Sequence, residues 1–568
     1  MHVCNNLSKA CDFHISRRVR SRYEAGRMLD RRSPSIRRLL ALTAGGCLTM
    51  TLCVAQAAAR PQERTEPRPS VVELDSGRIR GLDDGTVRTY SGIRFAQPPV
   101  GRLRWKDPVR VAAWRGVADA TKPGRPCTQV DQGKQIGGED CLFLDVTAPA
   151  KSSRKRLPVM VWLHGGGFLD GYGSMYNARR MADQGEVIVV TPNYRLGAFG
   201  YLALPGLSGS GTFGLADQLE ALKWVRRNAA AFGGDPGNVT LFGQSAGGIS
   251  TCALLTSPAT RGLIDKAVIQ SGACMLNWPT GTYIPVPDMP TITPYPSLKA
   301  SQDIGLAAAK QLGCAAGKEL ECLRSKPVSE LTKVNESFGT ALAHGTPLLP
   351  LEPAQALRTG KFLRVPVISG GTKSEGTGFV AGTAQAGIPV TAENYPTLMK
   401  NAFGEQAGKV MREYPLTGFS SPGLAWATVS SDRAWACPTL ESDEAMAART
   451  TVYAYEFADA KAPNIFETPS EFPLGAQHAS DLPYLFDLDG RPWDGLTSEQ
   501  WRLAEQMIGY WTSFAHAGKP QAAGAPAWPA FTPSGRTVLS LKPASQGGIG
   551  PVDLSGEHRC AFWRGLAG

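Results

Sequence analysis

The most regular feature of this 568-residue sequence is a series of short apolar runs that alternate with segments of helical periodicity. Each run has the length of a strand and is too short for a buried helix. The runs lie at 159–163, 187–191, 238–242, 264–272 and 365–368. Strands that alternate with helices are typical of parallel sheets covered on both faces, so we expect the α/β class with a mostly parallel central sheet.

The clearest helical pattern falls at residues 214–236, between the second and third runs. Its apolar side chains recur every three or four positions, which predicts one buried helix face. These side chains are Leu215, Leu219, Leu222 and Val225. The pair Gly233-Gly234 predicts the end of the helix, since Gly commonly terminates helices.

The remaining segments frame this core without dividing it. Residues 70–82 and 86–95 predict an antiparallel strand group ahead of the parallel sheet. Residues 280–350 and 377–450 are richer in Pro, Gly and irregular helix, and we interpret them as insertions that cover the site. No linker separates two cores, so residues 60–568 are predicted to form a single domain.

The first 59 residues differ in character from the rest. Four arginines (Arg31, Arg32, Arg37 and Arg38) precede an apolar stretch at 39–54, and small residues follow at Ala55–Ala59. This order is typical of a secretory signal peptide, so we expect cleavage near Ala57–Ala59, with Met1 or Met28 as the start. An uncleaved membrane anchor is the alternative, because residues 39–59 could nearly span a bilayer. No later segment predicts a transmembrane helix.

Charge gives little support for nucleic-acid binding. The formal net charge is +11, but residues 1–59 carry ten Lys and Arg against three acids. The predicted mature chain is therefore only slightly basic, and it has no basic stripe interleaved with aromatic residues. We expect a protein that is secreted or periplasmic, without stable membrane insertion, and either a monomer or a homodimer.

Eight of the 12 cysteines lie beyond residue 59, which matters in an oxidising compartment where disulfides persist. Their spacing favours two local pairs, Cys127 with Cys141 and Cys314 with Cys322. Spacing alone does not determine the connectivity among eight cysteines.

A candidate nucleophile lies in "NVTLFGQSAGGIS", residues 238–250. Ser245 stands between Gly243 and Gly247, after a predicted strand and before a small-residue helix. A serine in a Gly-rich turn is usually an ordinary loop residue, as in "GLSGSG" at 206–211. The strand–turn–helix context instead predicts a nucleophile elbow, in which a strained turn exposes the hydroxyl.

A base and an acid are expected later in the chain, in the order Ser, acid, His. His478 is the best candidate base, because "PLGAQHASDLPYLF" places it in a Gly-containing loop that enters an apolar segment. Glu375 is the best candidate acid, because it follows the predicted strand 365–368 in a Gly-rich loop, at the edge where α/β sheets keep their sites. Either residue taken alone would more often be an ordinary surface group.

An oxyanion hole is predicted in "WLHGGGF", residues 162–168. The N–H groups of Gly166 and Gly167 would face the substrate oxygen, with a third from Ala246 after the nucleophile. The same loop could hold phosphate, but no G-K-[ST] follows it. No HExxH or Cys/His metal spacing is present, and we expect no cofactor and no metal.

These blocks resemble the type-B carboxylesterase family over nearly all of residues 70–565. The similar motifs are "GIRFAQPPVGRLRW", "EDCLFLDV", "FGGDPGNVTLFGQSAGG", "VPVISGGTKSEG" and "GAQHASDLPYLF". The resemblance implies an α/β-hydrolase fold and a serine esterase that cleaves small-molecule carboxylic esters through Ser245, Glu375 and His478. It also implies disulfides Cys127–Cys141, Cys314–Cys322 and Cys437–Cys560, which leaves Cys252 and Cys274 unassigned and interpreted as buried thiols.

Two positions depart from the family pattern: Ser374 where Asp is common, and Asp481 where Glu often follows the histidine. Three rival functions are considered against the same residues. An interfacial lipase is disfavoured because the 127–141 loop encloses a short segment, and a cholinesterase because that segment lacks an aromatic residue for a quaternary ammonium. A non-catalytic binding member of the family would lack triad residues, and this chain has all three.

Overall fold

The antiparallel strand group predicted at the start of the chain forms one edge of the central sheet. The computed structural model describes residues 66–131, 133–286, 289–339, 342–489 and 495–567. Strand β1 (Arg68–Leu74) pairs with β2 (Gly77–Asp83), which pairs with β3 (Val87–Arg94). Strand β4 (Val117–Asp119) also pairs with β2. The predicted signal segment, residues 1–59, lies outside the described residues.

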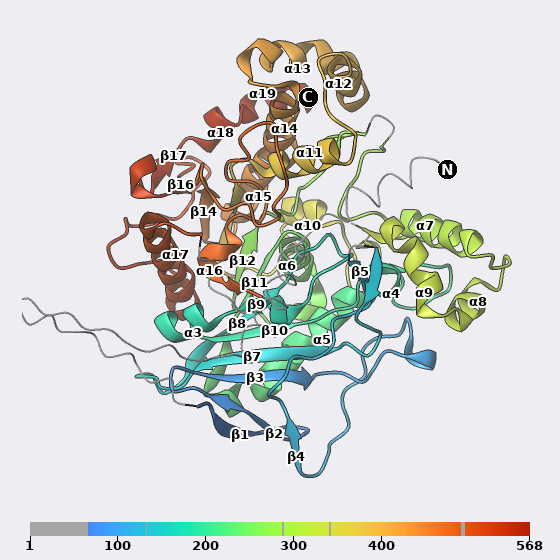
Figure 1. Ribbon diagram of the computed structural model, residues 1–568, viewed down its shortest axis with the longest axis vertical. Helices are drawn as coiled ribbons and strands as arrows, with labels where there is room; N and C mark the ends of the chain where they lie inside the picture. Colours follow the sequence, from blue (N-terminus) through green and yellow to red (C-terminus); the bar gives the residue numbers. More distant parts are fainter. Residues whose placement is uncertain (1–65, 132, 287–288, 340–341, 490–494, 568) are drawn as a thin grey trace, which may run out of the picture. The chain divides into compact units, whose positions relative to one another are not determined.

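The predicted parallel core follows along the same sheet. The strand order is β1-β2-β3-β7-β10-β8-β11-β12-β13-β14-β16-β17, and the described residues contribute 13 strands in all (Figure 1). From β10 to β16 every neighbouring pair is parallel. The further strands are β7 (Phe143–Pro149), β8 (Leu157–Leu163), β10 (Ile188–Pro192), β11 (Gly234–Gln244), β12 (Lys266–Gln270), β13 (Val367–Thr372), β14 (Val452–Phe457), β16 (Val538–Leu541) and β17 (Gly550–Val552).

Strand β8 shows why the short apolar runs of the sequence do not alternate with polar residues. Val159 and Val161 point into one hydrophobic cluster, and Met160 and Trp162 point into a second cluster on the other face. Because successive side chains of a strand point to opposite faces, a strand covered on both faces must be apolar throughout. The predicted mostly parallel α/β class is therefore confirmed.

Helices cover both faces of this sheet (Figure 1). On one face pack α5 (Phe213–Asn228) and α6 (Ala246–Thr256), and on the other α3 (Arg179–Gly185) and α17 (Ser498–Ala517). The predicted helix at 214–236 is shorter than expected, because α5 ends at Asn228 and a 3-10 turn follows. Gly233 then closes that turn with φ of 88°.

The two inserted segments hold more regular helix than the sequence predicted. The helices of the first are α7 (Leu298–Gln311), α8 (Glu319–Ser325) and α9 (Val328–Leu331), and α10 (Pro353–Thr359) follows it. Those of the second are α11 (Glu375–Gln385), α12 (Tyr395–Phe403), α13 (Ala407–Glu413), α14 (Pro422–Ser430) and α15 (Cys437–Ala447). A π-helix, Ser431–Ala436, joins α14 to α15 without a break. Such turns often mark functional sites.

Short elements complete the chain. Strand β5 (Gln129–Asp131) pairs with β6 (Lys134–Ile136), and β9 (Tyr176–Asn177) pairs with β15 (Asp487–Leu488). The remaining helices are α4 (Gly197–Tyr201), α16 (Leu482–Leu485), α18 (Leu554–Glu557) and α19 (Cys560–Ala567). Among the residues that the structure describes, no helix combines the length and apolar character that a bilayer span requires.

The described residues form four disulfides, and one of them corrects the sequence interpretation. Cys127–Cys141, Cys314–Cys322 and Cys437–Cys560 form as expected. Cys252 and Cys274 are not buried thiols but a fourth disulfide. The sequence did not indicate this pairing because it joins α6 to the loop after β12. These two segments meet only when β11, which precedes α6, pairs with β12 in the sheet. Four disulfides are consistent with an exported protein.

Candidate active site

Ser245 occupies the sharp turn between β11 and α6. Its backbone has φ of 57° and ψ of −126°, a conformation that costs a non-glycine residue free energy and persists only where the surroundings enforce it. The Ser245 N–H donates to the carbonyl of Gln270 at 2.9 Å, and this bond fixes the turn to β12. The side chain is half-buried. The predicted strand–turn–helix context is therefore present.

Gly247 is required for the close approach of helix α6 to strand β8. A Cβ added at Gly247 would lie 1.9 Å from the carbonyl oxygen of Leu163, a distance that no side chain tolerates. The small residues after Ser245 thus let the helix start directly beside the loop that follows β8. That proximity brings the turn and the predicted oxyanion loop together.

Glu375 and His478, 103 residues apart, meet in a direct hydrogen bond. Nδ1 of His478 lies 2.5 Å from Oε2 of Glu375, and both side chains are buried. Oε1 of Glu375 accepts from the N–H of Thr372 at 2.8 Å, so both carboxylate oxygens have a partner. Glu375 lies beyond the end of β13, as the sequence predicted, but it is the first residue of helix α11 and not part of a Gly-rich loop.

Ser374 holds the two loops together through its backbone. Its N–H donates to the carbonyl of Ala476 at 2.9 Å, and Ser374 forms an isolated parallel bridge with Gln477. The segment before the acid is thus joined to the segment before the histidine. This contact does not depend on the side chain at 374, where the chain departs from the family pattern.

The side chain of Gln244 contacts the other ring nitrogen of the histidine. Nε2 of Gln244 lies 3.2 Å from Nε2 of His478. A carboxylate only accepts hydrogen bonds, so Nδ1 of His478 must donate to Glu375. Nε2 then carries the lone pair and accepts from the amide of Gln244. This is the tautomer that a general base requires.

Asp481, three residues after His478, is a buried carboxylic acid. Its Oδ2 accepts from Nε2 of Gln270 at 2.8 Å, and Oε1 of Gln270 accepts from the indole of Trp511 at 3.0 Å. Burial raises the pKa of Asp481 to about 6, and the negative charge of Glu375 acts in the same direction. The hydrogen bond from Gln270 opposes them, because it lowers the pKa. Gln270, whose own carbonyl holds the turn at Ser245, thus links the turn to Asp481.

The glycine loop after β8 has the backbone needed for an anion site. Gly166 and Gly167 have φ of 107° and 60°, the left-handed region that favours glycine. No acceptor within the described residues takes the N–H of either one. The N–H of Ala246, first residue of α6, belongs to the helix amides that lack an intrahelical partner. Three donors of this kind suit a developing oxyanion.

His164, at the start of the loop, is a structural residue. Its Nδ1 donates to the carbonyl of Gly165 at 2.8 Å, and its ring stacks on Tyr194 with centroids 4.2 Å apart. Burial lowers the pKa of His164 to about 4 despite that hydrogen bond, so the ring is neutral at ordinary pH.

Aromatic side chains line the ring of His478. Trp435 and Phe379 have ring centroids 4.9 Å and 5.1 Å from it, and Trp278 packs edge-on against Trp435. No sequence pattern indicated a role for these residues, since Phe379 and Trp435 lie in the second inserted segment and Trp278 lies just before the first. Gln244 was also missed, although its place beside Ser245 was a usable signal.

Comparisons with known proteins identify the family to which this chain is similar. Residues 68–563 match the model of the carboxylesterase family. The chain is 34% identical to para-nitrobenzyl esterase of Bacillus subtilis over 83% of this chain and 94% of that protein. It is 31% identical to fumonisin B1 esterase of Sphingopyxis macrogoltabida over 84% of this chain and 87% of that protein. A solved PNB esterase structure superimposes with a TM-score of 0.70 at 31% identity, over 86% of this chain and 99% of that one.

Proposed function

Because the chain belongs to the carboxylesterase family and is a carboxylic ester hydrolase with the α/β-hydrolase fold, we propose that it works through a Ser245–His478–Glu375 triad and an acyl-enzyme. The observation that carries this proposal is the 2.5 Å contact between Nδ1 of His478 and Oε2 of Glu375. It leaves the Nε2 lone pair as the base, and Nε2 lies 3.2 Å from the side chain of Gln244, the residue before Ser245.

The reaction follows the order of a serine hydrolase. Nε2 of His478 takes the hydroxyl proton as Oγ of Ser245 attacks the ester carbonyl carbon. The N–H groups of Gly166, Gly167 and Ala246 stabilise the oxyanion. His478 then protonates the leaving alcohol, and a water molecule, activated in the same way, releases the acid from Ser245. Glu375 holds the imidazole in its tautomer and stabilises the imidazolium.

The substrate class is proposed to be small esters with an apolar group next to the scissile bond. Trp435 and Phe379 pack on His478, so the surface nearest the base is aromatic. Burying an apolar group there is favourable at roughly 25 cal/mol per Å².

Hydrolysis of p-nitrophenyl esters from acetate to palmitate by the wild type and Ser245→Ala tests the proposal. The variant is expected to lose on the order of 10⁶ in kcat, as triad knockouts do. Ser208→Ala is the matched control, because Ser208 is an exposed serine in the Gly-rich loop 206–211. Equal activity of wild type and Ser245→Ala would remove Ser245 as the nucleophile.

We also propose export, with cleavage near Ala57–Ala59. The four disulfides support it, because such bonds persist in oxidising compartments. Intact-mass measurement of the exported protein tests the cleavage, and retention of residues 39–59 would contradict it.

A further inference from the structure

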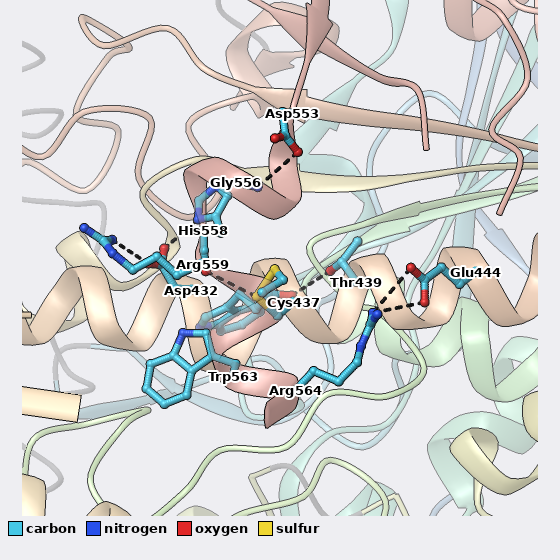
Figure 2. The surroundings of a disulfide bond; sticks show 12 residues. Asp432, Cys437, Thr439, Glu444, Asp553, Gly556, His558, Arg559, Trp563 and Arg564 are labelled. Carbon is cyan, nitrogen blue, oxygen red and sulfur yellow. Dashed lines mark hydrogen bonds and ion pairs between the residues drawn. A yellow bond between two sulfur atoms is a disulfide. The ribbon is translucent and has the colours of Figure 1, made fainter. Parts of the chain in front are cut away.

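A second buried histidine, His558, lies between two carboxylates. Its Nδ1 is 2.6 Å from Oδ1 of Asp432, and its Nε2 is 2.5 Å from Oε1 of Glu456. All three side chains are buried. Carboxylate oxygens only accept, and a neutral imidazole has one N–H, so bonds in both directions require the imidazolium. Figure 2 shows His558 pointing toward Asp432 beside the Cys437–Cys560 disulfide.

The charges around His558 keep it protonated. Burial alone would lower its pKa, but the bonds to Asp432 and Glu456 raise the pKa of His558 to about 10. Asp432 also accepts from the hydroxyl of Tyr414 at 2.8 Å and lies 3.3 Å from Arg559. The other charged groups of this network are Lys373, 3.9 Å from Glu456 and paired with Glu557, and Glu413, 3.2 Å from Arg559.

Asp432 belongs to the π-helix, and two residues of that helix contact the active site. Oγ of Ser431 accepts from the N–H of Gly376 at 2.9 Å, and Gly376 directly follows Glu375. The ring of Trp435 packs against His478 with centroids 4.9 Å apart. One six-residue turn therefore touches the segment of the acid and the ring of the base.

Glu456 connects the same histidine to the strand beside the acid. It lies on β14 opposite Gly371 of β13, four residues before Glu375. Lys373, between Gly371 and Glu375, donates its N–H to the carbonyl of Phe457 at 2.9 Å. His558 thus joins the π-helix on one side to the β13–β14 ladder on the other.

We propose that His558 is a positioning residue for the acid–base pair, holding the π-helix Ser431–Ala436 against β14 so that Ser431 and Trp435 keep Glu375 and His478 in register. The inference rests on the proposed triad. His558 touches neither substrate nor triad and acts through Asp432 and Glu456. A charged bridge is suited to this task, because breaking a buried pair leaves an uncompensated charge and so resists small displacements.

The test compares His558→Gln, Ser431→Ala and a control, with kcat expressed per active site titrated by diethyl p-nitrophenyl phosphate. Titration removes the effect of unfolded protein, which a merely structural role would produce. Arg226→Gln is the control, since it breaks the 2.8 Å pair with Asp265, which precedes the amino end of β12, whereas Glu375 lies beyond the carboxyl end of the parallel strand β13. The second readout is the acid limb of the kcat/KM profile against pH.

His558→Gln is expected to lower kcat per titrated site roughly 10- to 100-fold with little change in KM, because small displacements of catalytic groups have effects of this size. Its acid limb moves to lower pH, since a weaker bond from Nδ1 of His478 to Glu375 stabilises the imidazolium less. Ser431→Ala is expected to lower kcat about 3- to 10-fold and to move the acid limb to lower pH as well. Arg226→Gln changes neither readout.

A His558→Gln enzyme with kcat within twofold of wild type and an unshifted acid limb overturns the inference. If His558→Gln does not accumulate as folded protein, Ser431→Ala decides alone, and wild-type kcat in that variant overturns it. Failure of the proposed triad has a different signature: the wild type itself would not be titrated by the phosphate ester.

Discussion

Nε2 of Gln244 lies 3.2 Å from Nε2 of His478, so the residue before the proposed nucleophile hydrogen-bonds the proposed base. The amide is neutral and donates to the lone pair. It therefore holds the ring in the basic tautomer without favouring its protonated form.

This contact predicts the effect of Gln244→Glu. A carboxylate at that distance stabilises the imidazolium, so the acid limb of kcat/KM should move to higher pH by about one unit or more. The profile of p-nitrophenyl acetate hydrolysis between pH 4 and 9 measures it. Gln506→Glu, on α17, adds the same charge elsewhere and should leave the limb in place. An unshifted Gln244→Glu profile would argue against His478 as the base.

Glu375→Gln should preserve the fold and lose most of the activity. The amide can present an N–H to Nδ1 of His478 and favour the wrong tautomer, a change that lowers kcat about 10⁴-fold in a serine protease triad. Stopped assays with active-site titration measure the loss. Glu393→Gln, an exposed carboxylate between α11 and α12, is the matched control and should retain full activity. A loss below tenfold would make Glu375 dispensable.

Asp481 predicts a pH-dependent stability difference. Its pKa is raised from 3.8 to about 6 in the folded protein, so folding favours the protonated acid. The protonated acid therefore contributes to the free energy of unfolding below about pH 4, and this contribution is lost as pH rises through about 6. Asp481→Asn should therefore match wild type near pH 4 and exceed its free energy of unfolding at pH 7.5, by on the order of 2 kcal/mol. Urea midpoints at the two pH values measure the difference.

Asp84 is the control, because its pKa is shifted in the opposite direction from that of Asp481. Burial would raise its pKa, but Arg179 and the N–H groups of Thr86 and Val87 lower it below 3.8. Its contribution is present above about pH 4 and lost as pH falls through its folded pKa, so Asp84→Asn should destabilise the protein at pH 7.5. If Asp481→Asn also destabilised at pH 7.5, ionised Asp481 would have a compensating partner.

The Cys252–Cys274 disulfide predicts the absence of free thiols from residue 127 onward. Thiol titration of denatured protein lacking residues 1–59 should find none. Replacing both residues by Ala should lower the free energy of unfolding by about 3 kcal/mol, since the bond closes a loop with a sequence separation of 22. The Cys314–Cys322 pair, with a separation of 8, should contribute less. Two free thiols in the unmodified protein would restore the interpretation as buried cysteines.

The boundaries of β13 show where prediction from the local sequence pattern fails. The strand was predicted at 365–368 and runs over Val367–Thr372. The two glycines at 370–371, interpreted as loop, continue the ladder opposite Tyr455 and Glu456 of β14. Local propensity disfavours glycine in strands, but pairing on both sides overrides it.

The sequence by itself determined the alternation of strands and helices, the turn at Ser245 and the segments after the strands in which Glu375 and His478 lie. These follow from side-chain periodicity and glycine positions within a few residues, and a single chain displays both directly. Only the tertiary structure decided that Cys252 pairs with Cys274, that Trp435 packs on His478, and that His558 joins Asp432 to Glu456. Such contacts join segments that the sheet and its insertions bring together, and no spacing along the chain specifies which buried side chains then meet.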